Sequence, residues 1–377
     1  MHSSHLSIST HIFLTGATGY LGGSILTRLL SHPLSETFRL TVLVRAPEKA
    51  TQFRKMGIHA VEGSNTDLEL VRKLASNADI VVACTDADDL EAAKAILEGL
   101  KERNKATNRV PSLIHTVSSG TGVLIDDARG MHASDKIYED LDISALAAIP
   151  RTQPHREVDL QIIDADNEGY VKTYIVLPSL IYGRASGPLV DAGLQNPRSQ
   201  IIPQLVHAAI SRGRAGVLGK GANICSNVHI AELTSLYILL IDLIIASEEL
   251  NHDELGKSST RGRSPLPGSR PRTPVVLDPS AFTHGRSGYY FAENGEHTML
   301  SVSEAIGKAM VDLGHATDPE PSEFTEAEKK KYFPVSKYLE TNARCRAERA
   351  RLLGWKPKKT TKDMLASIKS EIKFAAD

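Results

Sequence analysis

The sequence is poor in cysteine and has a single tryptophan. Its three cysteines, Cys84, Cys225 and Cys345, lie far apart in a chain of 377 residues. An odd and sparse set of this kind excludes a disulfide framework and offers no metal-ligand spacing. We therefore expect no bound metal, and a protein of a reducing compartment such as the cytoplasm.

The chain also lacks an excess of charge of either sign. It has 44 lysines and arginines against 45 aspartates and glutamates, for a formal net charge of -1. This balance gives no electrostatic reason for nucleic acid or an anionic membrane to be the main partner. We expect neither of them, but a monomer or homodimer that binds a small-molecule substrate.

Long apolar runs are absent as well. The longest, from Leu233 to Ala246, is too short to span a bilayer and contains Asp242, so a buried helix is the better interpretation. The first 16 residues lack the basic region and apolar stretch of a secretory signal. These features predict a soluble, cytoplasmic protein with no membrane association.

What the chain does have is a regular alternation of two patterns. Amphipathic helical patterns separate short apolar runs, and this order is typical of βαβ units in a parallel sheet covered by helices on both faces. We therefore predict an α/β fold with a Rossmann-type, doubly wound parallel sheet. Its six expected strands lie within residues 11–16, 39–45, 58–63, 78–85, 112–119 and 171–183.

The same patterns suggest two parts. Residues 1–183 are predicted to form the dinucleotide-binding domain, with a long, poorly periodic insertion at 123–153 and a helix that begins near Pro154. Residues 184–377 are predicted to form mainly a smaller substrate-binding lobe of interleaved segments. Within it, residues 251–273 are rich in Ser, Pro, Gly and Arg and predict a flexible insertion. Three helices are expected near the end, at 301–314, 342–355 and 360–374.

A glycine-rich loop follows the first strand. In the run GATGYLG, Gly16, Gly19 and Gly22 stand between a strand pattern and a helix pattern. Glycine permits a sharp turn and close backbone approach to a pyrophosphate, and the helix N-terminus favours the phosphate charge. The loop predicts a dinucleotide site whose cofactor-binding residues are Gly16, Thr18, Gly19, Tyr20, Leu21 and Gly22.

The end of the second strand indicates which dinucleotide binds. Sites that prefer NAD usually carry an acidic residue there, which binds the ribose 2′-hydroxyl. This chain has Arg45 instead, followed by Lys49 and Arg54. Because a guanidinium can bind a 2′-phosphate and stack on adenine, we expect NADP(H) as cofactor, with Arg45 and Lys49 among the residues that bind it.

These motifs resemble the short-chain dehydrogenase/reductase superfamily, in its extended and atypical branches of NAD-dependent epimerase/dehydratase and NmrA-like proteins. Besides GATGYLGG, the runs IVLPSLIYG, NICSNVHIAEL and RLLGWKPKKT match family segments in order and spacing. The resemblance covers nearly the whole chain. It implies a substrate cleft between the two parts and places Pro178 beside the nicotinamide.

The resemblance breaks at the residues that carry the family's chemistry, a Tyr with a Lys four positions later. None of the ten tyrosines has this partner. At the expected helix, His155 takes the Tyr position and Asp159 the Lys position. Histidine exchanges protons near neutral pH, and Asp159, one turn on, is expected either to orient the His155 ring or to accept from a ribose hydroxyl.

Two further residues complete the expected catalytic set. The resemblance implies a Ser or Thr at the end of the fifth strand, where Ser118, Ser119 and Thr121 are available, and Ser119 is our choice. Tyr138, in the insertion, is a candidate to fold over the site and replace the missing phenol.

Three functions fit these observations. The first is an NADP(H)-dependent oxidoreductase that acts on a small or medium organic carbonyl or alcohol. The second is an NmrA-like dinucleotide sensor without turnover, and the third is an enzyme of the same fold that catalyses an isomerisation or cyclisation. The missing Tyr and Lys favour the last two, whereas the retained IVLPSLIYG run and the C-terminal lobe favour an enzyme.

Overall fold

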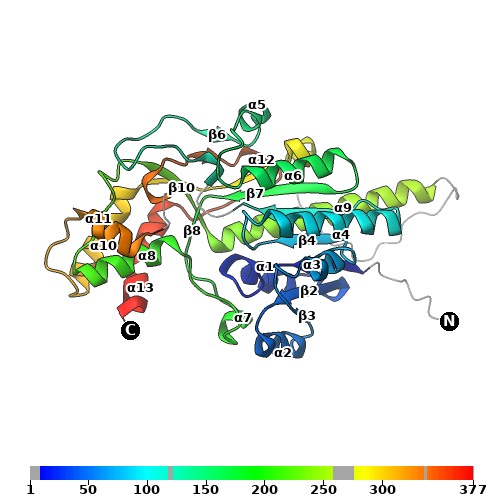
Figure 1. Ribbon diagram of the computed structural model, residues 1–377, viewed down its shortest axis with the longest axis horizontal. Coiled ribbons are helices and arrows are strands. Elements are labelled where there is room, and N and C mark those ends of the chain that lie inside the picture. Colours follow the sequence, from blue (N-terminus) through cyan, green and yellow to red (C-terminus); the bar gives the residue numbers. More distant parts are fainter. Residues whose placement is uncertain (1–8, 118–121, 258–275, 335–337, 377) are drawn as a thin grey trace.

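A seven-stranded parallel sheet forms the centre of the molecule (Figure 1). The computed structural model describes residues 9–117, 122–257, 276–334 and 338–376. The strands run in the order β11-β7-β5-β4-β1-β2-β3. Their bounds are β1 Thr10–Leu14, β2 Phe38–Val44, β3 His59–Glu62, β4 Ile80–Ala83, β5 Ser112–Thr116, β7 Lys172–Pro178 and β11 Tyr289–Ala292. This is the predicted doubly wound α/β arrangement.

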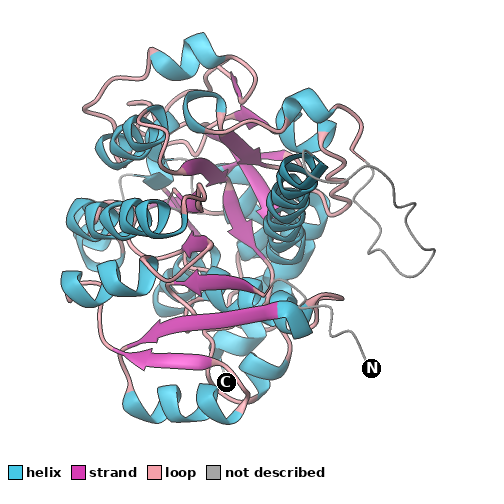
Figure 2. Ribbon diagram, turned by 90° about the vertical axis from the view of Figure 1, so that its right-hand side faces the viewer, coloured by secondary structure: helices cyan, strands magenta, loops and turns pink. Residues whose placement is uncertain are grey.

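Helices cover the sheet on both faces (Figure 2). On one face, α1 (Tyr20–Leu30) packs against α9 (Ile230–Lys257). A second group of helices consists of α3 (Leu68–Ala75), α4 (Leu90–Thr107) and α6 (Arg156–Asn167), in which α4 contacts both of the others. Helix α2 (Pro47–Lys55) contacts β2 and β3. Because helices shield the central strands, β4 is buried at all four positions, as its continuous apolar run predicts.

A second apolar core lies in the C-terminal lobe, at the left of Figure 1. There α8 (Ile201–Arg212), α10 (Met299–Asp312) and α13 (Thr361–Ala376) pack on one another. The small sheet β12-β10-β8 adjoins them, with bounds Glu296–Thr298, Ile224–His229 and Leu180–Tyr182. A further pair joins β9 (Gly216–Val217) to β13 (Ser322–Glu323), and α11 spans Glu326–Tyr332.

Several segments depart from the predicted elements. The expected sixth strand divides at Ser179 into β7 of the large sheet and β8 of the small one. The edge strand β11 was not predicted, because it has only four residues and no flanking pattern of its own. The second of the three expected C-terminal helices, at 342–355, contains instead β14 (Cys345–Arg346) and the short α12 (Glu348–Leu352). The other two, α10 and α13, are confirmed.

The segment expected to be irregular, 123–153, has short elements of its own. A 3-10 helix spans Gly122–Leu124, β6 (Tyr138–Glu139) pairs with β14, and α5 spans Ile143–Ala147. The helix expected from Pro154 begins at Arg156 instead, because His155 has a left-handed backbone conformation with φ 67°. Proline is therefore not in the first turn.

The long helix α9 corrects another expectation. It continues to Lys257, into the predicted flexible insertion 251–273, whose remaining residues lie outside the described part of the chain. Its stretch Ile230–Glu249 is long and apolar enough to cross a membrane by length and composition, so the judgement that the run is too short is wrong. Half of that stretch is buried within the fold, as a core helix would be.

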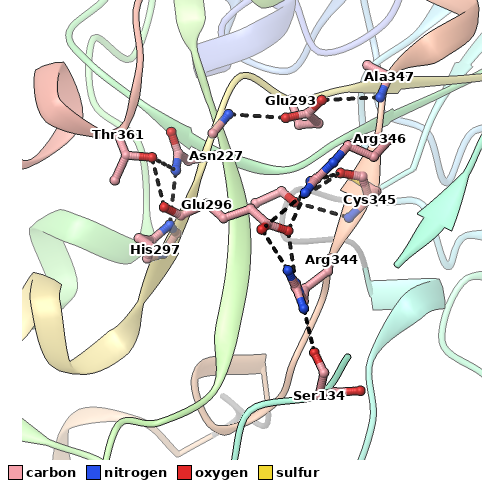
Figure 3. Close-up of polar contacts among 12 residues, drawn as sticks. Ser134, Asn227, Glu293, Glu296, His297, Arg344, Cys345, Arg346, Ala347 and Thr361 are labelled. Carbon is pink, nitrogen blue, oxygen red and sulfur yellow. Dashed lines mark hydrogen bonds and ion pairs between the residues drawn. The ribbon is translucent and has the colours of Figure 1, made fainter. Parts of the chain in front are cut away.

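A polar network ties the C-terminal lobe to the rest of the chain (Figure 3). Glu296 of β12 accepts hydrogen bonds from the guanidinium groups of Arg344 and Arg346, at 2.9–3.3 Å. Arg344 also donates to the carbonyl of Ser134 in the 123–153 segment. Segments that are distant in sequence are therefore joined by charge-assisted bonds.

Candidate functional site

The glycine-rich loop between β1 and α1 has the geometry of a phosphate cradle. Gly16 has φ 75°, and a β-carbon there would lie 2.4 Å from the carbonyl oxygen of Cys84. A β-carbon on Gly22 would lie 2.3 Å from the carbonyl oxygen of Gly16. Any side chain at either position would clash with backbone, so the loop requires glycine.

The start of α1 is open to an anion. Its N-cap residue, Gly19, has no side chain to cap the helix, and the first turn contains no acidic residue. The first backbone N–H groups and the positive end of the helix dipole are therefore available to a phosphate. The loop and helix have the geometry that a dinucleotide pyrophosphate requires.

A cavity of about 420 Å³ lies beside this cradle, at the carboxyl ends of the strands. We call it the strand-end cavity. It is the expected position for a ligand of an open α/β sheet. The lining comes from the cradle, the loop after β4, the ends of β5 and β7, and the segment before α8: Gly19, Tyr20, Leu21, Cys84, Thr85, Asp86, Ala87, Thr116, Pro178, Ile181, Asn196, Ser199, Gln200 and Ile201.

The segment between β8 and α8 packs on the cradle. The Tyr20 hydroxyl donates to the carbonyl of Gly183 at 2.6 Å, and the Gln195 side chain donates to the carbonyl of Tyr20 at 3.0 Å. The backbone N–H of Asn196 donates to the carbonyl of Thr18. Tyr20 and Thr18, both predicted cofactor residues, thus also anchor one wall of the strand-end cavity.

The cations after β2 differ in their availability. Arg54 is engaged, since it donates to the carbonyl of Ala60 and pairs with Glu62. Lys49 donates to the carbonyl of Leu194 at 3.4 Å. Arg45 is exposed directly after β2 and has no ion-pair partner among the described residues.

His155 is held by an aspartate other than the predicted one. Its Nδ1 lies 2.7 Å from Oδ1 of Asp88, and the same oxygen accepts the backbone N–H of His155 at 3.1 Å. Asp159 is fully buried and accepts from the hydroxyl of Tyr289 at 3.0 Å. The expectation that Asp159 orients His155 or meets a ribose is therefore wrong, because its carboxylate faces the interior.

Burial dominates the electrostatics around Asp159. It raises the pKa of the Asp159 carboxyl to about 7, while the Tyr289 hydrogen bond and the charge of Arg156 act against it. Arg156 is also buried and donates to the Tyr289 hydroxyl at 2.6 Å. Tyr289 thus bridges a buried cation and a buried carboxyl, an arrangement that fixes α6 against β11.

A second cavity, which we call the interlobe cavity, has a volume of about 710 Å³. The segment 125–154 forms one side, and β9, β13, α11 and the residues after it form the other. Its lining is Ile125, Arg129, Met131, Pro154, Leu218, Gly219, Glu323, Glu326, Lys329, Phe333, Pro334, Tyr338 and Glu340. Both apolar and charged side chains line it, as in sites for amphipathic small molecules.

His155 itself lines neither cavity, but its neighbours line both. On one side, Asp88 belongs to the loop whose residues 84–87 line the strand-end cavity. On the other, Pro154 and Tyr338 line the interlobe cavity, and the Tyr338 ring stacks on the His155 ring with centroids 6.4 Å apart. The Nε2 atom of His155 is buried and has no hydrogen-bond partner among the described residues.

The other predicted catalytic residues are less well supported by position. Ser119 lies outside the described residues. Tyr138 lies in β6, paired with Cys345, and the Lys136 ammonium is 4.3 Å from its ring centroid. Like His155, it lines neither cavity, and its neighbours Lys136 and Cys345 line neither as well.

Sequence reasoning missed several residues of this region. Asp88 follows the fourth strand, and its position at a strand end was a usable signal. No local sequence pattern could have identified Tyr338, because it is distant from His155 in sequence and contacts it only in the folded chain.

A small polar cluster lies at the end of β5. The Thr116 hydroxyl lies 2.7 Å from the Tyr237 hydroxyl and 3.3 Å from the Cys84 sulfur. Burial raises the pKa of the Cys84 thiol to about 12.

Comparison with known proteins agrees with this geometry. Residues 16–133 match the NAD(P)H-binding family model. The oxidase ucsJ of an Acremonium species is 32% identical over 356 residues, which cover 92% of each chain. The chain belongs to the same family as this oxidase, and residues 16–133 form its NAD(P)H-binding part. It is thus a member of a family of NAD(P)-binding oxidoreductases.

Two more distant relatives extend this picture. A 4-hydroxy-2-methyl-3-oxo-4-farnesyl-3,4-dihydroquinoline-1-oxide ketoreductase of Stigmatella aurantiaca is 23% identical, over 59% of this chain and 61% of the relative. The solved dTDP-glucose 4,6-dehydratase DesIV of Streptomyces venezuelae, with NAD bound, has a TM-score of 0.61. It is 14% identical and covers 97% of both chains, a likeness that concerns the extended-family fold.

Proposed function

We propose that this protein is an NADP(H)-dependent oxidoreductase that acts on a medium-sized organic carbonyl or alcohol bound in the interlobe cavity. The observation that carries the proposal is that His155 contacts Asp88, next to the wall of the strand-end cavity, and Tyr338, in the wall of the interlobe cavity. A proton-exchanging side chain at that boundary is what a carbonyl–alcohol interconversion needs beside a hydride carrier.

The cofactor would be held by the residues predicted from the sequence. Gly16 to Gly22 would surround the pyrophosphate, and Pro178, which lines the strand-end cavity, would adjoin the nicotinamide. Arg45 supports a preference for NADP(H), because a guanidinium can form paired hydrogen bonds to a 2′-phosphate. Lys49 is tied to Leu194 and would add charge rather than a direct contact.

The chemistry divides between cofactor and protein. When bound, the nicotinamide supplies or accepts the hydride. In alcohol oxidation the C–H hydride leaves the carbinol carbon, and Nε2 of His155 takes the hydroxyl proton as the carbonyl forms. In reduction His155 returns a proton to the carbonyl oxygen, so atoms and charges balance in either direction. Ser119 is proposed to donate a hydrogen bond to the same oxygen.

The interlobe cavity supports a substrate with an apolar, ring-containing body. Its volume of about 710 Å³ falls within the range of drug-sized ligand sites. Met131, Phe333 and Tyr338 would pack on rings, whereas Arg129 and Lys329 would meet oxygen substituents. The name of the Stigmatella relative, a ketoreductase of a farnesylated quinoline, fits the same class of substrate.

A panel of cyclic aromatic ketones and alcohols, followed by NADPH absorbance, tests the proposal. Once a substrate is found, His155→Ala should lower turnover by about a hundredfold or more, the usual size of a lost general acid. Cofactor affinity, measured by calorimetry, should hardly change, because Gly16 to Gly22 are the residues proposed to hold the phosphates. Unchanged turnover in His155→Ala would remove this residue from the chemistry.

The alternative is a dinucleotide sensor, or a non-redox enzyme of the same fold. The specific observation in its favour is Asp159, which is buried at the position where the family carries Lys. Tight NADPH binding with no NADPH consumption across the whole panel would favour the sensor. Conversion of a compound without a change in NADPH would favour isomerisation or cyclisation.

A further inference from the structure

Asp88 makes two contacts to one residue with a single oxygen. Its Oδ1 accepts the backbone N–H of His155 at 3.1 Å and faces the ring Nδ1 at 2.7 Å. The two residues are 67 positions apart in sequence. One carboxylate therefore fixes both the main chain and the side chain of His155.

The backbone of His155 needs such support. Its φ of 67° is left-handed, a conformation that costs free energy for any residue with a side chain. Histidine here precedes the first residue of α6, and its side chain does not cap that helix. Strained conformations of this kind persist only where the surroundings hold them, and they gather at functional sites.

The contact also determines which ring nitrogen can act. An ionised carboxylate can only accept, so Nδ1 of His155 must carry the proton that it shares with Asp88. In the neutral ring Nε2 is then left with a lone pair. That atom is buried beside Gly122, and the Tyr338 ring, which lines the interlobe cavity, stacks on the same imidazole.

We propose that Asp88 is the positioning residue of His155, which it holds as the Nδ1–H tautomer with Nε2 directed at the reacting oxygen. This inference rests on the proposed function of His155 in proton transfer. Asp88 itself does not touch the substrate, and it is more than half exposed, at 56% of its side-chain surface. Its neighbour Asp89 caps α4, so substitution of Asp88 leaves that helix start intact.

The first test is spectroscopic and requires no substrate. The protein is labelled with nitrogen-15 histidine, and the His155 signals are assigned by their loss in His155→Asn. The neutral His155 ring should show a protonated Nδ1 in the wild type and a shift towards protonated Nε2 in Asp88→Ala. Glu91→Gln, which removes an exposed carboxylate three residues on, should leave the tautomer unchanged. Persistence of the Nδ1–H form in Asp88→Ala would overturn the proposal.

The second test is kinetic. Asp88→Ala should lower turnover by about tenfold to a hundredfold, a part of the effect of losing His155, with unchanged NADPH affinity. Asp88→Glu keeps the carboxylate and should retain more turnover than Asp88→Ala, whereas a purely structural role would not favour the longer side chain. Asp88→Asn removes the charge at equal side-chain size and serves as a second variant. Full activity in both Asp88→Ala and Asp88→Asn would overturn the proposal. Full activity in His155→Ala would instead overturn the proton-transfer role, whatever the tautomer.

Discussion

A β-carbon on Gly122 would lie only 2.5 Å from Nε2 of His155 and 2.7 Å from Cδ2 of the same ring. Gly122 has no positive φ, so its backbone does not require glycine. What requires glycine is the close approach of the imidazole. The absence of a side chain at Gly122 therefore leaves the space that the His155 ring occupies.

Gly122→Ala should displace the His155 ring and lower turnover by tenfold or more, because the reacting nitrogen leaves its position. Cofactor affinity should remain as in the wild type. The double variant Gly122→Ala/His155→Ala provides the control, since it should be no slower than His155→Ala alone. Additive losses in the double variant would show that Gly122 acts on something other than His155.

Arg45→Asp should weaken NADPH binding by several-fold to a hundredfold, because a charge-assisted hydrogen bond to phosphate is worth roughly 1.5–3 kcal/mol. NADH affinity should stay constant or rise. Lys55→Asp makes the same change of charge at an exposed position of α2 and is the matched control. Calorimetric titration of both cofactors measures the effect, and equal affinity of the wild type for the two would contradict the preference.

The sequence was informative where the chemistry is local. The glycines of the cradle follow β1 directly and precede α1, so a continuous run of residues contains the whole signal. The five strands from β1 to β5 were predicted because each is apolar and bounded by a helix pattern. Arg45 was found in the same way, as the residue that follows β2.

The rest depends on contacts between distant residues. Asp88 lies in the loop after β4 and contacts His155, which is 67 residues away in sequence. No local pattern predicts this contact. Cys345 and Arg346 lie within an apparent helix pattern but form β14 because β6 offers them a pairing partner. Because Asp159 is four residues after His155, it was expected to face the His155 ring. Its carboxyl instead accepts a hydrogen bond from Tyr289, which lies on the unpredicted strand β11.

The ionisation of Glu296 should make the free energy of unfolding decrease at low pH. Burial opposes its ionisation, but hydrogen bonds from Arg344 and Arg346 lower the pKa of its carboxyl to about 2. A depressed folded-state pKa contributes stability that is present above the usual pKa, near 4.5, and is lost as pH falls towards 2. Figure 3 shows the carboxylate between the two guanidinium groups.

Glu296→Gln should therefore lower the free energy of unfolding at pH 7 by about 1–3 kcal/mol, the size of bonds to charged groups. The deficit should shrink near pH 3, because Glu296 of the unfolded wild type binds a proton there that the folded protein does not bind. Glu69→Gln, which breaks an exposed pair with Arg72, should have little effect at either pH. Urea titrations at the two pH values test this, and a constant deficit would exclude the proposed linkage.

Asp159 should give the free energy of unfolding the opposite pH dependence, with a decrease at high pH. Burial raises the pKa of its carboxyl from 3.8 to about 7, so the folded protein binds a proton that the unfolded chain releases. The stability linked to this group is fully present below about pH 4 and is lost as pH rises through 7. Asp159→Asn keeps an oxygen that can accept from Tyr289 but cannot ionise, and it should remove this dependence.

The expected result is a variant more stable than the wild type at pH 8, by on the order of a few kcal/mol, and similar to it at pH 4. Asp164→Asn, on the exposed side of the same helix α6, is the matched control and should follow the wild type at both pH values. Thermal or urea unfolding across this range measures the difference. If Asp159→Asn instead destabilises the protein most at pH 8, the carboxylate is ionised in the fold and pairs with Arg156 through Tyr289, and burial does not dominate its titration.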